Sequence, residues 1–326
     1  MHTIMKNLLV AACAALMLLY ITGCTSDDTG NGPVVPNGTR YNGAVFTNVT
    51  TTNDVVYGSN TTQAGNTINL TMDVYEPEGD TEAARPLVVL AHGGGFIGGD
   101  KGSVQELATY LAQSGYLVAS ISYRLVDFDP GANRAAAIGL GVIQAVHDMK
   151  AAIRYFVKDA TEGNQYRANT NLVFLGGVSA GGFMALHTAY WNDNSELNAL
   201  SAIDANIVTY VNNNGGIEGN SGNNTFTNYT IAGVMNAVGA LIQADFVDAG
   251  EPPLISIHGT NDQVVPYLEG ESDGSGVVTQ GSGLIHPVAD QAGVTNTLIT
   301  VQGGDHGAFG TIHFSEVRQF FFNQLP

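Results

Sequence analysis

Residues 171–182 read Asn-Leu-Val-Phe-Leu-Gly-Gly-Val-Ser-Ala-Gly-Gly, and this stretch decides how the chain folds. An apolar run typical of a buried strand leads directly into the pentad Gly-Val-Ser-Ala-Gly, and a helical pattern follows to about Tyr190. A serine on so tight a strand-to-helix turn is exposed at the end of a sheet. The flanking glycines, Gly177 and Gly181, remove side chains that would collide there. The pattern predicts that Ser179 is a nucleophile.

The pentad alone is weak evidence, because a chain with 41 glycines can contain it by chance. A second motif, His-Gly-Gly-Gly-Phe at residues 92–96, follows the apolar run 86–91 and strengthens the prediction. Three consecutive glycines let the backbone approach a substrate carbonyl and point amide hydrogens at it. The alternative is an ordinary Gly-rich turn. We expect His92 to brace this loop rather than to act as a base.

Short β-branched runs alternate with helical patterns from residue 44 onward. This alternation predicts an α/β fold with a mostly parallel central sheet and helices on both faces. Expected strands, the first of them an antiparallel edge strand, lie at residues 67–75, 86–91, 116–123, 171–176, 254–258 and 297–301, with further regular structure at 231–241. Expected helices lie at residues 102–114, 134–160, from Ser179 to about 190, and 314–323, where at least two of Phe320, Phe321 and Phe322 should be core residues.

Residues 192–228 break this pattern with two Asn/Gly-rich stretches, 212–216 and 220–224. A segment of this composition is most often a solvated surface insertion, and the alternative is a lid over the active site.

Two residues downstream of Ser179 complete the expected machinery. Asp262 follows the strand 254–258 and His306 follows the strand 297–301, in the order serine, acid, histidine that a serine elbow requires. Other candidates for the acid fit less well: Asp245 and Asp248 precede the strand, and Asp290 lies in a less regular stretch. For the base, His286 and His313 do not follow a strand and a glycine, and His258 belongs to a strand end. Asp305, beside His306, should point into its loop.

Together these motifs resemble the hormone-sensitive-lipase-like and related carboxylesterase families of α/β-hydrolases. The matching segments span about residues 66–322 and comprise 92–96, 122–125, 177–182, 258–262 and 304–307. The resemblance implies an α/β-hydrolase fold and places the oxyanion donors on the backbone amides of Gly94, Gly95 and Ala180. It implies a serine carboxylic-ester hydrolase in which Ser179, Asp262 and His306 are the catalytic residues and an acyl-enzyme forms on the serine. Such an enzyme needs no metal and no cofactor, and the remaining histidines show no ligand spacing.

Composition bounds the partners. The chain of 326 residues carries 29 acids against 11 bases, a net charge of −18, and its bases are scattered. Nucleic acid is therefore not an expected partner, and neutral or weakly charged substrates are favoured. Hydrophobic residues make up 44%, enough for the core of one catalytic domain, which we expect at residues 41–326.

The N-terminus resembles a bacterial lipoprotein signal. Lys6 gives a basic start, residues 8–21 form an apolar run, and Ile-Thr-Gly-Cys at 21–24 resembles a lipobox. We expect a signal peptide at residues 1–23, lipidation of Cys24, a flexible tether at 24–40, and anchoring to the membrane of the bacterial cell envelope, at the outer membrane or cell surface. The alternative is an ordinary signal peptide. Cys13 lies within the apolar run, so the mature chain would form no intramolecular disulfide.

The substrate stays open between acetyl or feruloyl esters of polysaccharides, short-chain lipids and polyesters, and Phe96, Ile97 and residues 192–228 are candidates to shape the acyl pocket. Two other functions compete. A prolyl-oligopeptidase-like peptidase shares the fold and the triad order, but such enzymes normally carry a propeller domain ahead of the hydrolase, and only a linker and edge strands precede residue 86 here. A catalytically inactive surface lipoprotein could use the fold for binding, and the intact set of catalytic residues argues against it.

Overall fold

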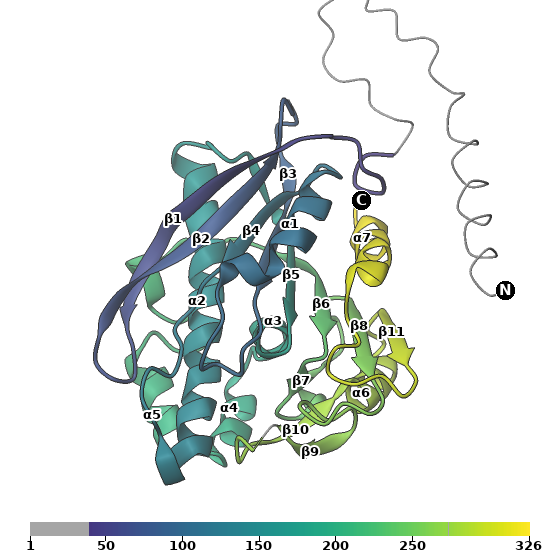
Figure 1. Cartoon of the computed structure of the whole chain (residues 1–326). Coiled ribbons are helices and arrows are strands. Elements are labelled where there is room, and N and C mark those ends of the chain that lie inside the picture. The colour runs from purple at the N-terminus through teal and green to yellow at the C-terminus, as the bar shows by residue number, and fades with distance from the viewer. Residues whose placement is uncertain (1–38, 273) are drawn as a thin grey trace, which may run out of the picture. The chain divides into compact units, whose positions relative to one another are not determined.

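The computed structural model describes residues 39–272 and 274–326, in which an eight-stranded sheet is the central element (Figure 1). The expected signal peptide and Cys24 lie outside the described residues. Across the sheet the strands are β1 (Val49–Thr61), β2 (Thr67–Pro77), β4 (Leu117–Ile121), β3 (Arg85–Ala91), β5 (Ala168–Val178), β6 (Ile231–Ala237), β8 (Leu254–Gly259) and β11 (Asn296–Val301).

Pairing within this sheet is antiparallel between β1 and β2 and between β2 and β4, and parallel at every other junction. A small antiparallel sheet contains β7 (Ala240–Leu241), β10 (Val278–Gly281) and β9 (Glu269–Glu271). The helices are α1 (Gln105–Ala112), α2 (Arg134–Glu162), α3 (Ala180–Tyr190), α4 (Asn194–Ser201), α5 (Asn206–Asn213), α6 (Ser282–Ala292) and α7 (Phe314–Asn323), with short 3-10 turns η1 (Lys101–Val104), η2 (Gly131–Asn133), η3 (Ser221–Asn223), η4 (Ala244–Phe246) and η5 (Thr311–His313).

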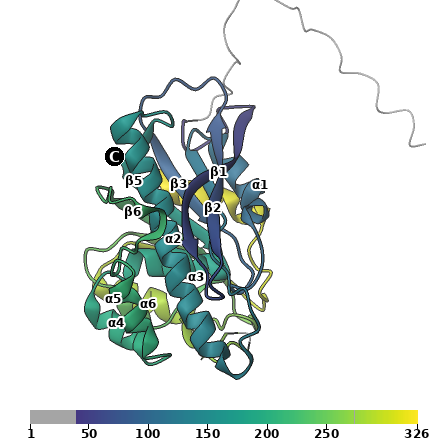
Figure 2. The same ribbon diagram turned by 90° about the vertical axis from the view of Figure 1, so that its left-hand side faces the viewer.

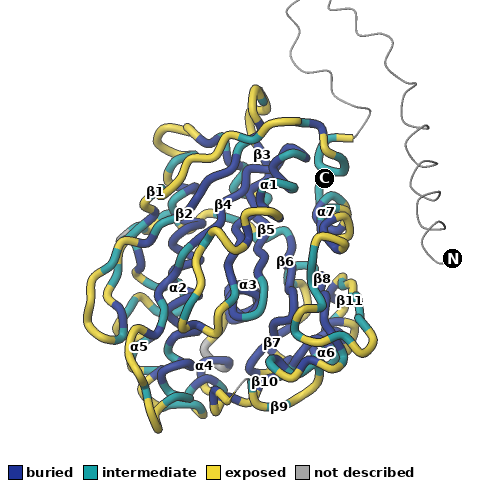
Figure 3. Tube along the Cα trace, viewed as in Figure 1, coloured by how far each residue is buried: buried dark blue, intermediate teal, exposed yellow. Residues whose placement is uncertain are grey.

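Helices cover both faces of the large sheet, as the sequence predicts. Successive side chains of a strand point to opposite faces, so β3 contributes to two separate cores. Leu87 and Val89 belong to the core that also contains residues of α2, α3 and α6, whereas Val88 and Leu90 belong to the core that contains residues of α1 and α7. Figure 2 shows α1 and α2 on opposite sides of the strands, and β3 and β4 are buried along their whole length (Figure 3).

The last helix packs as expected, since Phe320 and Phe321 are buried in the core that α7 shares with α1. The segment Gly131–Glu162, which contains α2, is long and apolar enough to cross a membrane. Because 89% of its most apolar window is buried inside the protein, it has the character of a core helix.

The prediction for residues 67–75 is correct in part. The strand is present as β2 and is antiparallel, but it is not the edge of the sheet, because β1 pairs with its outer side. Most residues of β1 are exposed and polar, with Tyr57 the buried exception. A solvated edge strand needs no regular apolar alternation, and this is why the pattern did not reveal it.

Residues 192–228 contain the helices α4 and α5 and the turn η3 rather than loop alone. The segment is fixed to the core by a buried polar cluster. The guanidinium of Arg124 pairs with the Asp148 carboxylate of α2 at 2.7 Å, both side chains being fully buried. The hydroxyl of Ser221, within η3, donates to the same carboxylate at 2.6 Å. Because a buried charge is tolerated only when paired, this cluster fixes the insertion against α2.

Candidate active site

Ser179 occupies the turn between β5 and α3 with φ 56° and ψ −119°. Positive φ is unfavourable for a residue with a side chain, by about 1–2 kcal/mol, and such strain concentrates at functional sites. The Ser179 amide donates to the carbonyl of Ala237 at 2.8 Å and helps to hold the turn.

The two glycines of the pentad are required by contacts that leave no room for a side chain. A Cβ at Gly177 would lie 2.1 Å from the carbonyl carbon of Gly181, and one at Gly181 would lie 2.2 Å from the carbonyl oxygen of Ala91. Real Cβ atoms do not approach backbone this closely. The glycines therefore let α3 pack against the ends of β3 and β5, which fixes the serine at the carboxyl end of the sheet.

Asp262 and His306 lie on the loops that follow the neighbouring parallel strands β8 and β11. The Ser179 hydroxyl donates to His306 Nε2 at 2.9 Å, and His306 Nδ1 donates to Asp262 Oδ2 at 2.8 Å. The two loops are tied together by backbone hydrogen bonds, one of which joins the Asn261 amide to the Gly304 carbonyl at 2.9 Å. The three side chains thus form one continuous hydrogen-bonded relay.

The environment of Asp262 keeps its carboxylate ionised. Burial acts to raise the pKa of Asp262, but hydrogen bonds from His258, His306 and two backbone amides outweigh burial and hold this pKa well below its usual range. Those amides belong to Val264 and Val265, and each lies 2.9 Å from Oδ1. An ionised carboxylate can only accept, so Nδ1 of His306 carries the proton and Nε2 presents a lone pair to the serine.

Gly94, Gly95 and Ala180 lie along the same cavity as Ser179 and His306. Within the described ranges no backbone hydrogen bond uses the amide of Gly94 or Gly95 as its donor. Ala180 is the first residue of α3, where an amide has no intrahelical acceptor. Gly94 adopts φ 123°, and a Cβ there would lie 2.1 Å from the Gly98 carbonyl oxygen. The loop therefore folds tightly and leaves its amides available beside the serine.

His92 braces this loop, as expected. Its Nδ1 donates to the Gly93 carbonyl at 2.7 Å, and its ring stacks on Tyr123 with the centroids 4.4 Å apart. The Tyr123 hydroxyl donates to the His92 carbonyl at 2.8 Å. Burial lowers the pKa of His92, so the ring is neutral and serves as packing.

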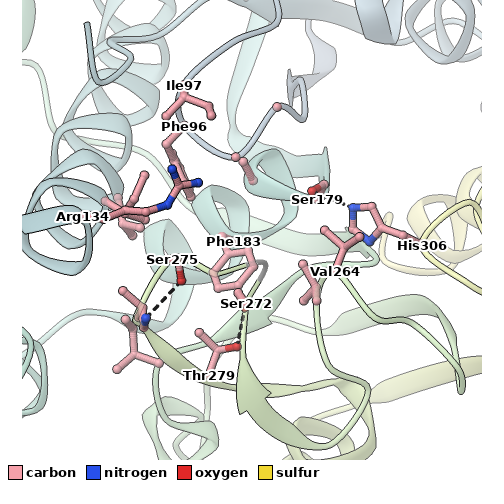
Figure 4. A pocket seen from close by; sticks show the side chains of 18 of the residues that line it. Phe96, Ile97, Arg134, Ser179, Phe183, Val264, Ser272, Ser275, Thr279 and His306 are labelled. Atoms are coloured by element: carbon pink, nitrogen blue, oxygen red, sulfur yellow. Dashed lines mark hydrogen bonds between the residues drawn. The ribbon is translucent and has the colours of Figure 1, made fainter. Parts of the chain in front are cut away.

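A cavity of about 430 Å³ opens beside Ser179 and His306 (Figure 4). Its walls are mainly apolar, and Phe96 and Ile97 line it as expected. No described residue of 192–228 is among those that line it, so the lid alternative gains no support. Instead part of the wall comes from the segment around β9 and β10, contributed by Ser272, Ser275, Val277 and Thr279.

Sequence reasoning missed one neighbour of the relay. His258 was interpreted only as part of a strand end, yet its buried Nε2 lies 3.4 Å from Asp262 Oδ2. The signal was available, because His258 ends the strand that leads to Asp262.

The competing candidates make other contacts: His286 bonds to Asn296 at 2.6 Å, and the Asp305 carboxylate accepts from the Gly307 amide. Within the part of the chain that the structure describes, no cluster of three His, Cys, Asp or Glu side chains is placed to hold a metal ion.

Several solved structures with a similar fold are described as esterases. A truncated form of a carbohydrate esterase from gut microbiota is 20% identical, with 84% of this chain and 96% of that chain covered and a TM-score of 0.56. Esterase 2 of Thermogutta terrifontis phosphorylated by paraoxon is 20% identical, with 82% and 92% covered and a TM-score of 0.57. The apo form of that esterase is 19% identical, with 90% and 96% covered and a TM-score of 0.57. Comparison with curated protein sequences finds no match.

Fold and site together define the class of this protein, an α/β-hydrolase of the serine esterase type. The family model BD-FAE matches residues 72–272, which is more than half of the chain. The chain therefore belongs to the BD-FAE family.

Proposed function

We propose that this protein hydrolyses carboxylic esters through an acyl-enzyme on Ser179. The observation that carries the proposal is the relay from Asp262 through His306 to Ser179, with contacts of 2.8 and 2.9 Å, at the edge of a mainly apolar cavity. A serine hydroxyl is a weak nucleophile until a base removes its proton, and the relay supplies that base in the required tautomer.

Acylation begins when Ser179 Oγ attacks the ester carbonyl carbon and His306 Nε2 accepts the serine proton. Asp262 keeps the imidazole oriented and stabilises its positive charge. The carbonyl oxygen becomes an oxyanion, which accepts hydrogen bonds from the amides of Gly94, Gly95 and Ala180. The carbon–oxygen bond to the alcohol then breaks, and His306 donates its proton to the departing alkoxide.

Deacylation repeats the sequence with water. His306 Nε2 removes a proton from the water as its oxygen attacks the acyl carbon, and the same amides hold the second oxyanion. The bond to Ser179 Oγ breaks, the serine regains its proton from His306, and the carboxylic acid leaves.

For the substrate we propose acyl esters of extracellular carbohydrates, with short-chain lipid or polyester esters as the alternative. One structural neighbour is described as a carbohydrate esterase from gut microbiota, and forms of Thermogutta terrifontis esterase 2 are described with propionate and with butyrate bound. Release of acetate from acetylated xylan, compared with release from a triglyceride and a polyester, tests this choice. Hydrolysis of the triglyceride or the polyester without release of acetate from the xylan would contradict the proposal that carbohydrate esters are the substrate.

The ester hydrolase itself is tested with p-nitrophenyl acetate and the variant Ser179→Ala. We expect the variant to lose turnover by about 10,000-fold or more, leaving only the residual catalysis typical of sites without their nucleophile. A wild-type protein no faster than the variant across several short acyl chains would support an inactive binding protein. Cleavage of a prolyl peptide amide in preference to esters would support the peptidase alternative.

We further propose that the chain is exported and anchored to the cell envelope by a lipid on Cys24. The support is the lipobox-like sequence at 21–24 and the apolar run before it. A Cys24→Ala variant should leave the membrane fraction and become soluble, and retention of the variant in that fraction would contradict the anchor.

A further inference from the structure

One cation enters the active-site cavity on the side away from the relay. Arg134, the first residue of α2, lines the cavity together with Ser179 and His306. Figure 4 shows Arg134 on the opposite side of the pocket from these two residues. Among the described residues that line the cavity, Arg134 and His306 are the only titratable side chains, and neither Asp nor Glu is present.

Arg134 is also the one described Lys or Arg side chain without a polar partner. Every other one pairs with a carboxylate, a carbonyl or an aromatic ring. The Nε atom of Arg134 is shielded from solvent and has no hydrogen-bond acceptor. In a chain with 29 acids and a net charge of −18, a lone guanidinium in an apolar pocket is unusual. Arg134 is partly exposed, but its shielded Nε–H donor has no acceptor among the described residues, and an unsatisfied shielded donor is unfavourable, so this end of the cavity can accept an anionic group from a ligand.

The walls around Arg134 are built by two elements packed directly on each other. Gly276, in the turn between β9 and β10, adopts φ 76°, and a Cβ there would lie 3.0 Å from the Ala135 Cβ of α2. The hydroxyls of Ser272 and Thr279 lie 2.8 Å apart, and the Ser275 hydroxyl accepts from the Val277 amide at 3.0 Å. At this end of the cavity the described hydroxyls of the turn bond within it, and the guanidinium of Arg134 is the charged group among the described residues that line it.

A guanidinium forms its strongest contacts with carboxylates, through two parallel N–H donors, and an apolar setting strengthens the pair. We propose that Arg134 binds a carboxylate on the part of the ester substrate that fills this cavity. The inference rests on the ester hydrolase proposed above and narrows its substrate to esters that carry a carboxylate separated from the reacting carbonyl by an apolar stretch. Ile138, Val142 and Phe183 are among the residues that line the cavity and would contact that stretch. Arg134 is a specificity-determining residue and takes no part in the relay.

The carboxylate has two sources. It belongs to the acyl half when the substrate is a monoester of a dicarboxylic acid, and to the alcohol half when the alcohol is itself an acid. In both cases the positive charge of Arg134 locally offsets the repulsion that a chain of net charge −18 exerts on an anionic substrate.

The test compares matched esters with and without the carboxylate. For the acyl half these are the p-nitrophenyl monoester of suberic acid and p-nitrophenyl octanoate; for the alcohol half they are 4-acetoxybenzoate and its methyl ester. The measured quantity is the ratio of kcat/KM for the carboxylate ester to kcat/KM for its neutral partner. We expect Arg134→Gln to lower this ratio by about 10- to 100-fold in one of the two pairs, which identifies the source.

Two further variants make the result specific. Arg134→Lys keeps the positive charge but lacks the two parallel N–H donors of a guanidinium, so it should retain part of the kcat/KM ratio. Lys158→Gln removes a half-exposed cation that does not line the cavity, so it should leave this ratio unchanged. Thermal unfolding shows whether each variant is folded. A ratio that changes by less than about twofold in both pairs for Arg134→Gln overturns the inference while ester hydrolysis stands. Absence of turnover of all four esters by the wild type rejects the proposed hydrolase itself.

Discussion

The two ends of the active-site cavity are encoded in different ways. The end at Ser179 is built from short motifs in which backbone contacts dictate the residue type, as at Gly181 against the Ala91 carbonyl. The end at Arg134 is built where the first turn of α2 meets the segment 272–279, and no motif joins these segments in the sequence. The contrast indicates that reaction chemistry is fixed by local backbone constraints, whereas substrate selection depends on tertiary packing.

The largest expected effect lies at the relay. His306→Ala removes the base, so we expect kcat for p-nitrophenyl acetate to fall by about 10,000-fold or more, while KM changes little. Circular dichroism controls for folding. If kcat stays within about tenfold of the wild-type value, another residue is the base, and the catalytic role given to His306 at the Ser179 end of the cavity is wrong.

Asp262→Asn should have the next largest effect. An asparagine no longer stabilises the imidazolium by charge and no longer holds the imidazole in the required tautomer, and we expect kcat to fall by about 10,000-fold. Steady-state hydrolysis of p-nitrophenyl acetate measures the loss. A loss as small as that of a distant surface substitution would contradict the role given to this carboxylate.

The same variant has a signature in stability against pH. The pKa of Asp262 is lower in the folded chain than its ordinary value of 3.8. A depressed pKa means that the carboxylate stabilises the fold above the unfolded value and that this stabilisation is lost as pH falls through the folded value. Thermal unfolding should therefore separate wild type from Asp262→Asn more at neutral pH than in strong acid. An equal separation at both would show that ionisation of Asp262 does not support the fold.

Gly181→Ala tests the backbone constraint itself. The added Cβ would lie 2.2 Å from the Ala91 carbonyl oxygen, and we expect the free energy of unfolding to fall by about 1–3 kcal/mol, as for other overpacked sites. The matched control is Gly310→Ala, since no heavy atom lies within 4 Å of a Cβ there. Chemical denaturation measures both variants. Equal stability of the two would remove the steric reason for the pentad.

The smallest effect is expected at the other end of the cavity. Val142 on α2 lines the cavity, and Val142→Phe would fill part of it. We expect kcat/KM for p-nitrophenyl octanoate to fall by about tenfold relative to the acetate ester, as when a pocket loses room for a few methylenes. Val146→Phe, one turn further along α2 and outside the lining, should lower stability without changing this ratio. An unchanged ratio in Val142→Phe would show that the acyl group does not occupy this cavity.

Much of the fold could be predicted because its buried strands and long helices carry strong apolar patterns. The helix expected at residues 134–160 is α2, and the strand expected at 86–91 is β3. The parts that escaped prediction lack such patterns. β1 is a solvated edge with few apolar residues, and α6 carries Pro287, which obscures a helical pattern.

The candidate site divides in the same way. Ser179, Asp262 and His306 were predicted because each follows a strand in a fixed order, and the structure brings them within hydrogen-bond distance of one another. Arg134 could not be found from sequence, since only the fold shows that its guanidinium lacks a partner and lines the cavity. His258 could have been linked to the acid from sequence, because it lies at the end of the strand that leads to Asp262.

Covalent labelling tests the central claim most directly. Paraoxon should react with the activated serine and release p-nitrophenol, leaving one diethylphosphoryl group per chain, which intact-mass measurement counts and peptide mapping locates. We predict that this group lies on Ser179, that its formation abolishes ester hydrolysis in proportion, and that Ser179→Ala takes up none. A phosphoryl group on a different residue, or ester hydrolysis that persists in fully labelled protein, would contradict the account.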